Sequence, residues 1–180
     1  LIGTTDIDSV SDGEVPKLIS KGTDSTAGAA FVRHSANAGG CGLYLAKSRN
    51  ATIGSNTIVQ SGDELGRVTF SGDDGTNLNT QGAQIAAHVD GTPGENDMPG
   101  RLQFYTTADG AATVTERMRI TSAGRVGINE NSPDRELHIS NTTPYIRVES
   151  TGANQPATLE LYHTRGNGSD KWPVSIATDD

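Results

Sequence analysis

The sequence predicts an all-β protein with short strands and glycine-rich turns. Apolar and polar residues alternate in short runs, as in strands that bury one face and expose the other. Turn dipeptides such as Asp74-Gly75, Asp90-Gly91 and Asp109-Gly110 separate these runs. No segment keeps the 3.6-residue helical period long enough to predict a stable helix.

The elements follow in chain order. The first stretch is polar, and we expect at most one helical turn there, over Val15–Lys21. The following residues predict a succession of strands: 31–34, 43–47, 67–70, 84–89, 101–105, 117–121, 125–128, 136–139, 145–149, 158–162 and 174–176. Ala123-Gly124 stands between two of them and predicts a tight hairpin turn, because glycine reaches positive φ at little cost.

Composition indicates that the chain cannot build a thick core of its own. Of 180 residues, 22 are glycine, 33% are hydrophobic and 4% are aromatic. We therefore expect a thin apolar face that is buried against other copies of the chain. Six alternating residues are predicted to form this inner core: Met118, Ile120, Val126, Ile128, Leu137 and Ile139. Alternation places Arg117 and Arg119 on the outer face, where we expect pairing with acidic residues such as Glu116 on a neighbouring strand or chain.

Charge and cysteine content exclude several classes of protein. The formal net charge is -8, which argues against nucleic acid as a partner. No apolar run approaches the ~18 residues of a membrane span, so no membrane insertion is expected. Cys41 is the single cysteine, which rules out an intrachain disulfide and suggests a buried or half-buried structural thiol. Because the first residue is Leu1, we expect a piece of a longer protein.

Internal similarity indicates repeated modules. Residues 66–70 (GRVTF) match residues 100–104 (GRLQF), each followed by an Asp-Gly turn. Residues 31–33 and 43–45 similarly match 145–147 and 159–161. These relations predict three parts, and repeated modules stacked along one direction favour an extended object. The parts are a polar N-terminal connector (1–30), a β-rich fibre module (31–140) and the truncated start of a second, similar module (141–180).

Three segments resemble the distal part of bacteriophage tail fibres and tailspikes, upstream of a self-cleaving intramolecular chaperone domain. They are DGTPGENDMPGRLQFYTTADG (90–110), ERMRITSAGRVGI (116–128) with Asn131-Ser132-Pro133, and TIGSNTIVQSGDELG (52–66). The resemblance implies an elongated, intertwined homotrimeric β fibre, β-helix or β-prism-like, in the virion tail and outside the cell. It also implies other virion tail proteins and a host surface glycan or outer-membrane receptor as partners. The chaperone is not in this chain, so no protease activity is implied.

Candidate sites are few, and the ordinary structural interpretation stands beside each. Asp90, Glu95 and Asp97 share a glycine- and proline-rich loop and could bind Ca²⁺ through hard oxygen ligands, or simply cap turns. Tyr105 and Trp172 are the best aromatic platforms for a glycan, with packing as the alternative. The four histidines, of which His138 lies in a predicted strand, have no metal-ligand spacing.

The sequence thus predicts a structural, receptor-facing fibre segment that mediates host-surface attachment, with no cofactor and no catalytic residue of its own. Two alternatives remain open. One is a polysaccharide-cleaving tailspike with carboxylates near Asp73, Asp90 and Asp97. The other is a cellular adhesin or a fibre of a contractile injection system.

Overall fold

A computed structural model describes residues 28–152 and 156–159, the single residues 18, 20 and 23, and the backbone of two short strands near the C-terminus. The chain divides into two compact units, Leu1–Asn141 and Thr142–Asp180. The expected turn over 15–21 and the expected strands over 158–162 and 174–176 lie largely or wholly outside the described residues. The three predicted parts and their boundaries stay predictions.

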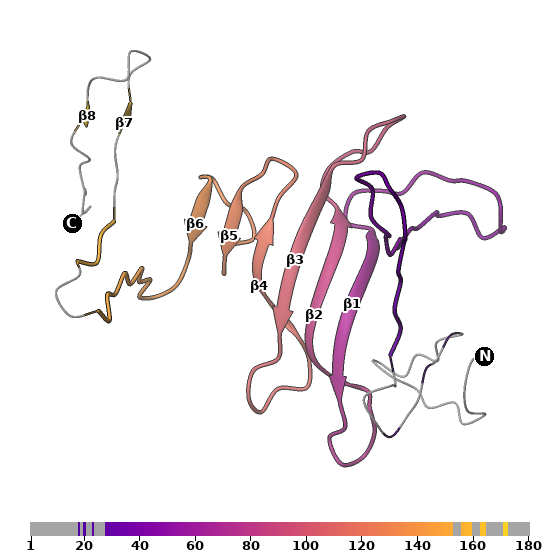
Figure 1. Cartoon of the computed structure of the whole chain (residues 1–180), viewed down its shortest axis with the longest axis horizontal. Coiled ribbons are helices and arrows are strands. Elements are labelled where there is room, and N and C mark those ends of the chain that lie inside the picture. The colour runs from indigo at the N-terminus through magenta and orange to yellow at the C-terminus, as the bar shows by residue number, and fades with distance from the viewer. Residues whose placement is uncertain are drawn as a thin grey trace. The chain divides into compact units, whose positions relative to one another are not determined.

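The first unit contains one six-stranded sheet in which the strands follow chain order (Figure 1). The strands are β1 (Glu64–Gly72), β2 (Thr80–Val89), β3 (Gly100–Thr106), β4 (Thr115–Ile120), β5 (Val126–Ile128) and β6 (Leu137–Ile139). Neighbours from β1 to β5 pair antiparallel, and β5 pairs with β6 in parallel. The described residues form no helix, so the all-β prediction is confirmed.

The register of the sheet sorts its side chains into two faces. Val68 lies opposite Ile85, Ile85 opposite Phe104, and Phe104 opposite Met118. Cross-strand partners point to the same side of a sheet, so these four residues form a continuous apolar row. A second row crosses the sheet beside it through Ala87, Leu102, Ile120, Val126 and Leu137. The intervening residues, such as Gln84 and Gln103, point to the opposite face.

The related segments 66–70 and 100–104 are equivalent strands on either side of β2. Arg67 and Gln103 both lie opposite Ala86, and Val68 and Phe104 both lie opposite Ile85. The sequence similarity therefore corresponds to a real structural repeat within the sheet. Each copy contributes alternate residues to the two faces.

The polar face is the more covered of the two. Gln84 and Gln103 are buried, and the loop residues Ala112–Val114 line a small cavity with Gln84 and Arg67. Thr107 fixes this loop through hydrogen bonds from its amide and hydroxyl to the carbonyls of Gly82 and Gln81. Among the described side chains, the buried hydrophobic ones are Val59, Ala86 and Val89 alone.

Three predicted strands are absent as strands. Residues 31–34, 43–47 and 145–149 form no ladder with any other described residue. Their alternating pattern is that of strands, but a strand needs a partner for its backbone N–H and C=O groups. In the second unit, β7 (His163–Thr164) pairs antiparallel with β8 (Lys171–Trp172).

Candidate functional site

The most unusual surface of the chain is the apolar face of the sheet. We define the apolar face by the large hydrophobic residues that the register places on that side: Val68, Phe70, Ile85, Val89, Leu102, Phe104, Met118, Ile120, Val126, Ile128, Leu137 and Ile139. All six residues of the predicted inner core belong to it. The structure therefore brings them together on one side of three adjacent strands.

Described segments cover this face at one end, where Val89 is fully buried and the Leu45 side chain lies against Gly66, and leave most of the rest open. Val68, Phe70, Ile85, Leu102, Ile120 and Leu137 are all exposed, with Phe70 reaching 56%. The ladder positions of the face carry no charged residue, and Arg117 at its end donates a hydrogen bond to the hydroxyl of Thr106. Contiguous exposed apolar surface of this kind marks an interaction site in a folded protein. The six residues of the predicted inner core share this face. Ile120 and Leu137 are exposed and the other four are half-buried, and burial of all six in a trimer stays a prediction.

Two β-bulges shape the polar face. In β4, Phe104 faces Met118 and Tyr105 faces Glu116, so Arg117 is an extra residue. The extra residue lets Glu116 and Arg119 point to the same side although they are three positions apart. Their side chains are largely buried and pair at 2.5 Å and 2.7 Å between guanidinium nitrogens and carboxylate oxygens.

The bulge in β1 does the same for a second pair. Glu64 faces His88 and Gly66 faces Ala87, which leaves Leu65 as the extra residue. Arg67 then reaches Glu64 across 3.2 Å. The sequence carries a signal for this in the spacing Glu-x-x-Arg, which occurs in both strands, but the spacing alone does not reveal a bulge. Arg119 lies on the face opposite Met118 and Ile120, as alternation predicts, and it pairs with Glu116. The pair forms within β4 and not between neighbouring strands or chains, and both side chains are largely buried.

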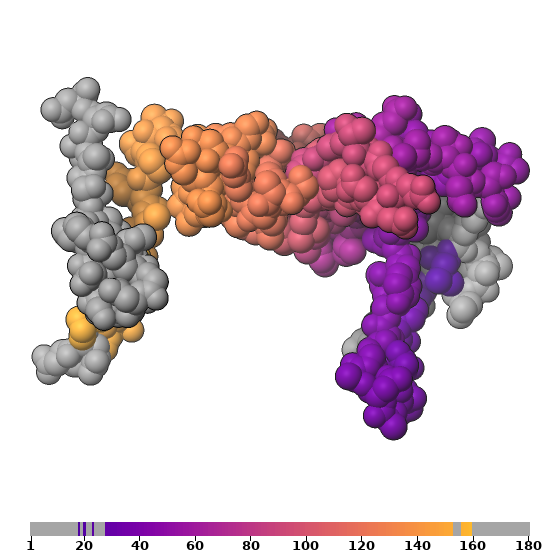
Figure 2. Space-filling view, turned by 90° about the horizontal axis from the view of Figure 1, so that it is seen from above, coloured from indigo at the N-terminus to yellow at the C-terminus, as the bar shows by residue number. Residues whose placement is uncertain are grey.

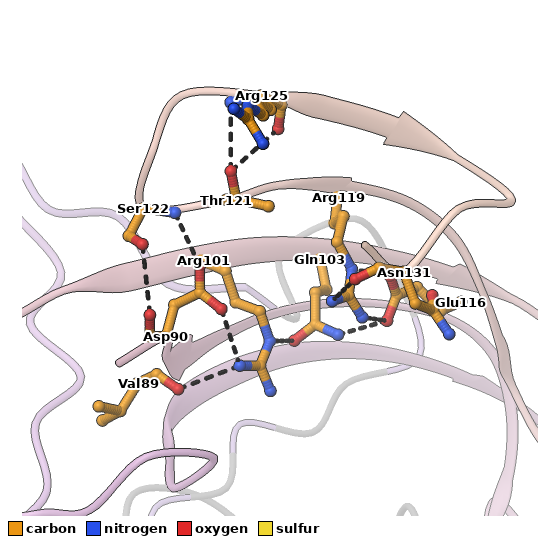
Figure 3. Close-up of polar contacts among 10 residues, drawn as sticks. All are labelled: Val89, Asp90, Arg101, Gln103, Glu116, Arg119, Thr121, Ser122, Arg125 and Asn131. Carbon is orange, nitrogen blue, oxygen red and sulfur yellow. Dashed lines mark hydrogen bonds and ion pairs between the residues drawn. The ribbon is translucent and has the colours of Figure 1, made fainter. Parts of the chain in front are cut away.

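A chain of hydrogen bonds runs along the polar face (Figure 3). Arg101 donates to Gln103, and the Gln103 amide donates to Glu116. Arg119 links Glu116 to the carbonyl of Asn131, 2.6 Å away. Burial by itself would raise the pKa of Glu116, but the hydrogen bonds from Arg119 and Gln103 outweigh it, and the pKa lies below its usual value. The network therefore holds Glu116 ionised within the fold.

Asp90 anchors the other end of this network to the turn before β5. One carboxylate oxygen accepts a hydrogen bond from Arg101 at 3.1 Å, and the other accepts one from the Ser122 amide at 2.8 Å. Burial opposes ionisation of Asp90, yet the hydrogen bonds from Ser122 and Arg101 leave its pKa lowered. A cavity of about 330 Å³ opens beside this corner, and none of its lining residues is aromatic.

The calcium ligands expected in this loop do not assemble. Asp90 is engaged with Arg101 and Ser122, and Glu95 and Asp97 do not join it in a ligand set. Across the described residues, no group of three or more His, Cys, Asp or Glu side chains could hold a metal ion. Asp97 instead closes a tight turn with Gly94 through two backbone hydrogen bonds of 3.0 Å and 3.2 Å. This matches the alternative interpretation, a turn-capped hairpin loop.

The two predicted glycan platforms have different outcomes. Tyr105 lies half-buried on the polar face between Gln84 and Glu116. Burial first and the charge of Glu116 second raise the pKa of its phenol. Trp172 belongs to β8, and its side chain lies outside the described part. Glycan contact by either residue stays a prediction.

Two further residues complete the account of the sequence candidates. Cys41 is exposed, contrary to the expected buried or half-buried thiol, and its Sγ lies 2.8 Å from the carbonyl oxygen of Phe31. His138 faces Asp134 at 3.1 Å and Glu130 at 3.9 Å. In the part of the chain that the structure describes, no helix is long and apolar enough to cross a membrane.

Comparison with known proteins places the fold. No family model and no curated protein sequence matches the chain. Among solved structures, the chain is similar to the carboxy-terminal domain of the bacteriophage T5 L-shaped tail fibre, with a TM-score of 0.58 and 12% identity over 81% of this chain. It is also similar to the same domain solved with its intramolecular chaperone domain, with a TM-score of 0.58 and 13% identity over 80% of this chain. The fold is therefore that of a phage tail fibre domain.

The match extends over part of the neighbours only. The chain spans 64% of the length of the first structure and 44% of the second. The expectation of a tail fibre is thus supported at the level of fold, and the position within a fibre belongs to the proposals below.

Proposed function

We propose that this chain is a structural segment of a phage tail fibre in the virion tail that assembles as a homotrimer and takes part in host-surface attachment. The observation that carries the proposal is the apolar face, which is broad, free of charge at its ladder positions and poorly covered in a single chain. The fold supports the fibre context. In the proposed assembly the three apolar faces point inward and the glycan and protein contacts lie outside.

Energetics favour assembly over a free monomer. Burial of apolar surface stabilises by roughly 25 cal/mol per Å², and a chain with three buried hydrophobic side chains among its described residues gains little of this alone. A threefold axis brings equivalent residues together, so Ile120 and Ile128 would form apolar rings in a trimer. Because each copy carries a net charge of -8, contacts between copies must be apolar or locally paired.

The carboxylates of the polar face fit a structural role better than a catalytic one. Asp90 and Glu116 are both ionised and hydrogen-bonded to arginines. A glycoside hydrolase needs one carboxyl group held protonated to act as general acid, with a raised pKa. We therefore assign Asp90 a structural role through Arg101 and Ser122, and the function that we propose is non-enzymatic.

Competition with phage adsorption tests the proposal. Host cells preincubated with the purified protein should adsorb fewer phage particles, and antibodies against the chain should label the tail fibres in electron micrographs of virions. Label on the capsid, or none on the virion, would overturn the fibre assignment. Release of reducing sugar from host polysaccharide would overturn the proposal that the chain is non-enzymatic. Unchanged adsorption would overturn the proposal that it takes part in host-surface attachment.

A further inference from the structure

The segment before the sheet is an arm with the pattern of a strand and no ladder partner among the described residues. We define the N-terminal arm as residues 29–46. It doubles back at a loop where Arg33 donates hydrogen bonds to the Gly40 carbonyl and the Asn37 side chain. Its backbone makes no hydrogen bond to the backbone of any other described residue. Figure 2 shows the purple arm standing out from the body of the sheet.

The arm exposes its hydrophobic side chains. Val32 is 73% exposed and Tyr44 is 89% exposed, and Phe31 and Leu43 are exposed as well. Among the described residues, the arm contacts the sheet at its C-terminal end, near Leu45. A Cβ at Gly66 in β1 would meet the Leu45 side chain, and Arg49 pairs with Asp63 at 2.6 Å just before β1.

The same arrangement occurs twice in the chain. Residues 145–147 and 159–161 repeat the pattern of residues 31–33 and 43–45. Tyr145, Ile146 and Leu159 are exposed, and residues 145–149 again lack a ladder with any described residue. The pattern thus recurs in both units without a ladder partner among the described residues, and this observation motivates the search for a partner in another chain.

We propose that the N-terminal arm lies across the apolar face of a neighbouring copy of this chain and forms its two strands there. This inference rests on the proposed homotrimer and names the contact that covers its interface. The apolar face needs cover, and the exposed hydrophobic side chains of the arm supply it. The face of a sheet presents side chains and no free N–H or C=O groups, so the backbone partners of the two strands come from the two halves of the arm, which doubles back on itself. Exchange of such an element between identical chains is a low-cost route to assembly.

The distribution of acidic residues favours contact between the arm and the apolar face of another copy. Although the chain holds 22 acidic residues, no Asp or Glu occurs between Asp24 and Asp63. The ladder positions of the apolar face carry no acid either. Contact between arm and face therefore brings no carboxylates together, although both chains are strongly acidic overall.

Photo-crosslinking of the full chain tests the contact. With Tyr44 replaced by p-benzoylphenylalanine, illumination should join two copies, and the linked peptides should include Ile85 or Leu102. The matched control is the same replacement at Ile53, which is 102% exposed on a loop outside the arm and should give no cross-link between copies. Cross-links within one chain only, or from arm to arm only, overturn the inference.

A second pair of variants separates this inference from the proposed trimer. Val32→Asp should raise the protein concentration at which trimers dissociate by at least tenfold, whereas Ile53→Asp should leave it unchanged. If Val32→Asp and wild type dissociate alike while wild type is trimeric, the arm contact is wrong and the trimer stands. A wild-type protein that is monomeric throughout overturns both.

Discussion

Leu102 and Ile120 lie opposite each other on β3 and β4, on the same side of the sheet, and both are 37% exposed in a single chain. The neighbouring cross-strand pair, Gln103 and Arg119, points to the other side of the sheet. Both of these side chains are largely buried. The sheet therefore departs from the usual distribution, with its polar side covered and its apolar side largely open away from the buried Val89. That departure is resolved if the open side is covered by other copies.

Truncation of the Ile120 side chain should show whether other copies bury the apolar face in the assembly. Ile120→Ala should lower the free energy of unfolding by about 2–5 kcal/mol per chain, as expected for a buried isoleucine in the assembly. Ile53→Ala, at a side chain that is fully exposed, should change it by less than about 0.5 kcal/mol. Thermal unfolding of the two variants side by side is the measurement. Equal and small changes would mean that Ile120 stays as exposed in solution as it is in one chain.

Acidification should weaken the fold through the polar face. The pKa values of Glu116 and Asp90 are lowered in the folded chain, so their ionised forms stabilise it. This contribution is complete above the ordinary carboxylate pKa of about 4 and is lost as the pH falls below it. The melting temperature should therefore drop between pH 5 and pH 3. A loss of about 1 kcal/mol corresponds to a drop of several degrees in a domain of this size.

Glu116→Gln provides the control for that drop. The amide keeps the shape of the side chain but does not titrate, so the variant should start from a lower melting temperature at pH 7 and lose less of it on acidification. Parallel curves for wild type and Glu116→Gln would show that Glu116 is not a source of the pH dependence.

Gly127 should tolerate no side chain. It lies in the middle of β5, and a Cβ there would run into the carbonyl oxygen of Glu130. Gly127→Ala should cost about 1–3 kcal/mol, as overpacking does. Gly72→Ala, at the end of β1 where a Cβ would meet nothing, is the matched variant. Similar melting temperatures for the two would contradict the close approach of the 129–130 turn to β5.

Gly124 is constrained by conformation and not by space. Its φ is +78°, and a Cβ there would meet nothing within 4 Å. Gly124→Val should destabilise by about 1–2 kcal/mol, because a β-branched residue adopts this left-handed conformation poorly. Ala123→Ser, in the same turn, should have little effect. Equal yields and melting temperatures for the two variants would contradict the prediction that residue 124 must adopt a positive φ.

The sequence was informative where local pattern decides the structure. Alternation predicted the strands from β1 to β6 and the common face of Met118, Ile120, Val126 and Ile128, and the Ala123-Gly124 dipeptide predicted a turn with positive φ. Alternation failed at residues 31–34 and 145–149, because a strand also depends on a partner that lies far away or in another chain.

The polar face was harder to predict for a related reason. Two bulges place Glu116 beside Arg119 and Glu64 beside Arg67, and a bulge depends on the register of two strands and not on one segment. The acidic loop illustrates the same dependence on distant residues. Its acidic residues are close in sequence, but Asp90 is committed to Ser122, which lies 32 positions away.

Equilibrium sedimentation of the purified chain tests the central claim most directly. At micromolar concentration and pH 7, the account predicts a single species with three times the mass of one chain. It also predicts that dissociation on dilution is accompanied by loss of the β-sheet signal in circular dichroism, because one chain leaves its apolar face open. A folded monomer with the full β-sheet signal at the same concentration would contradict the account.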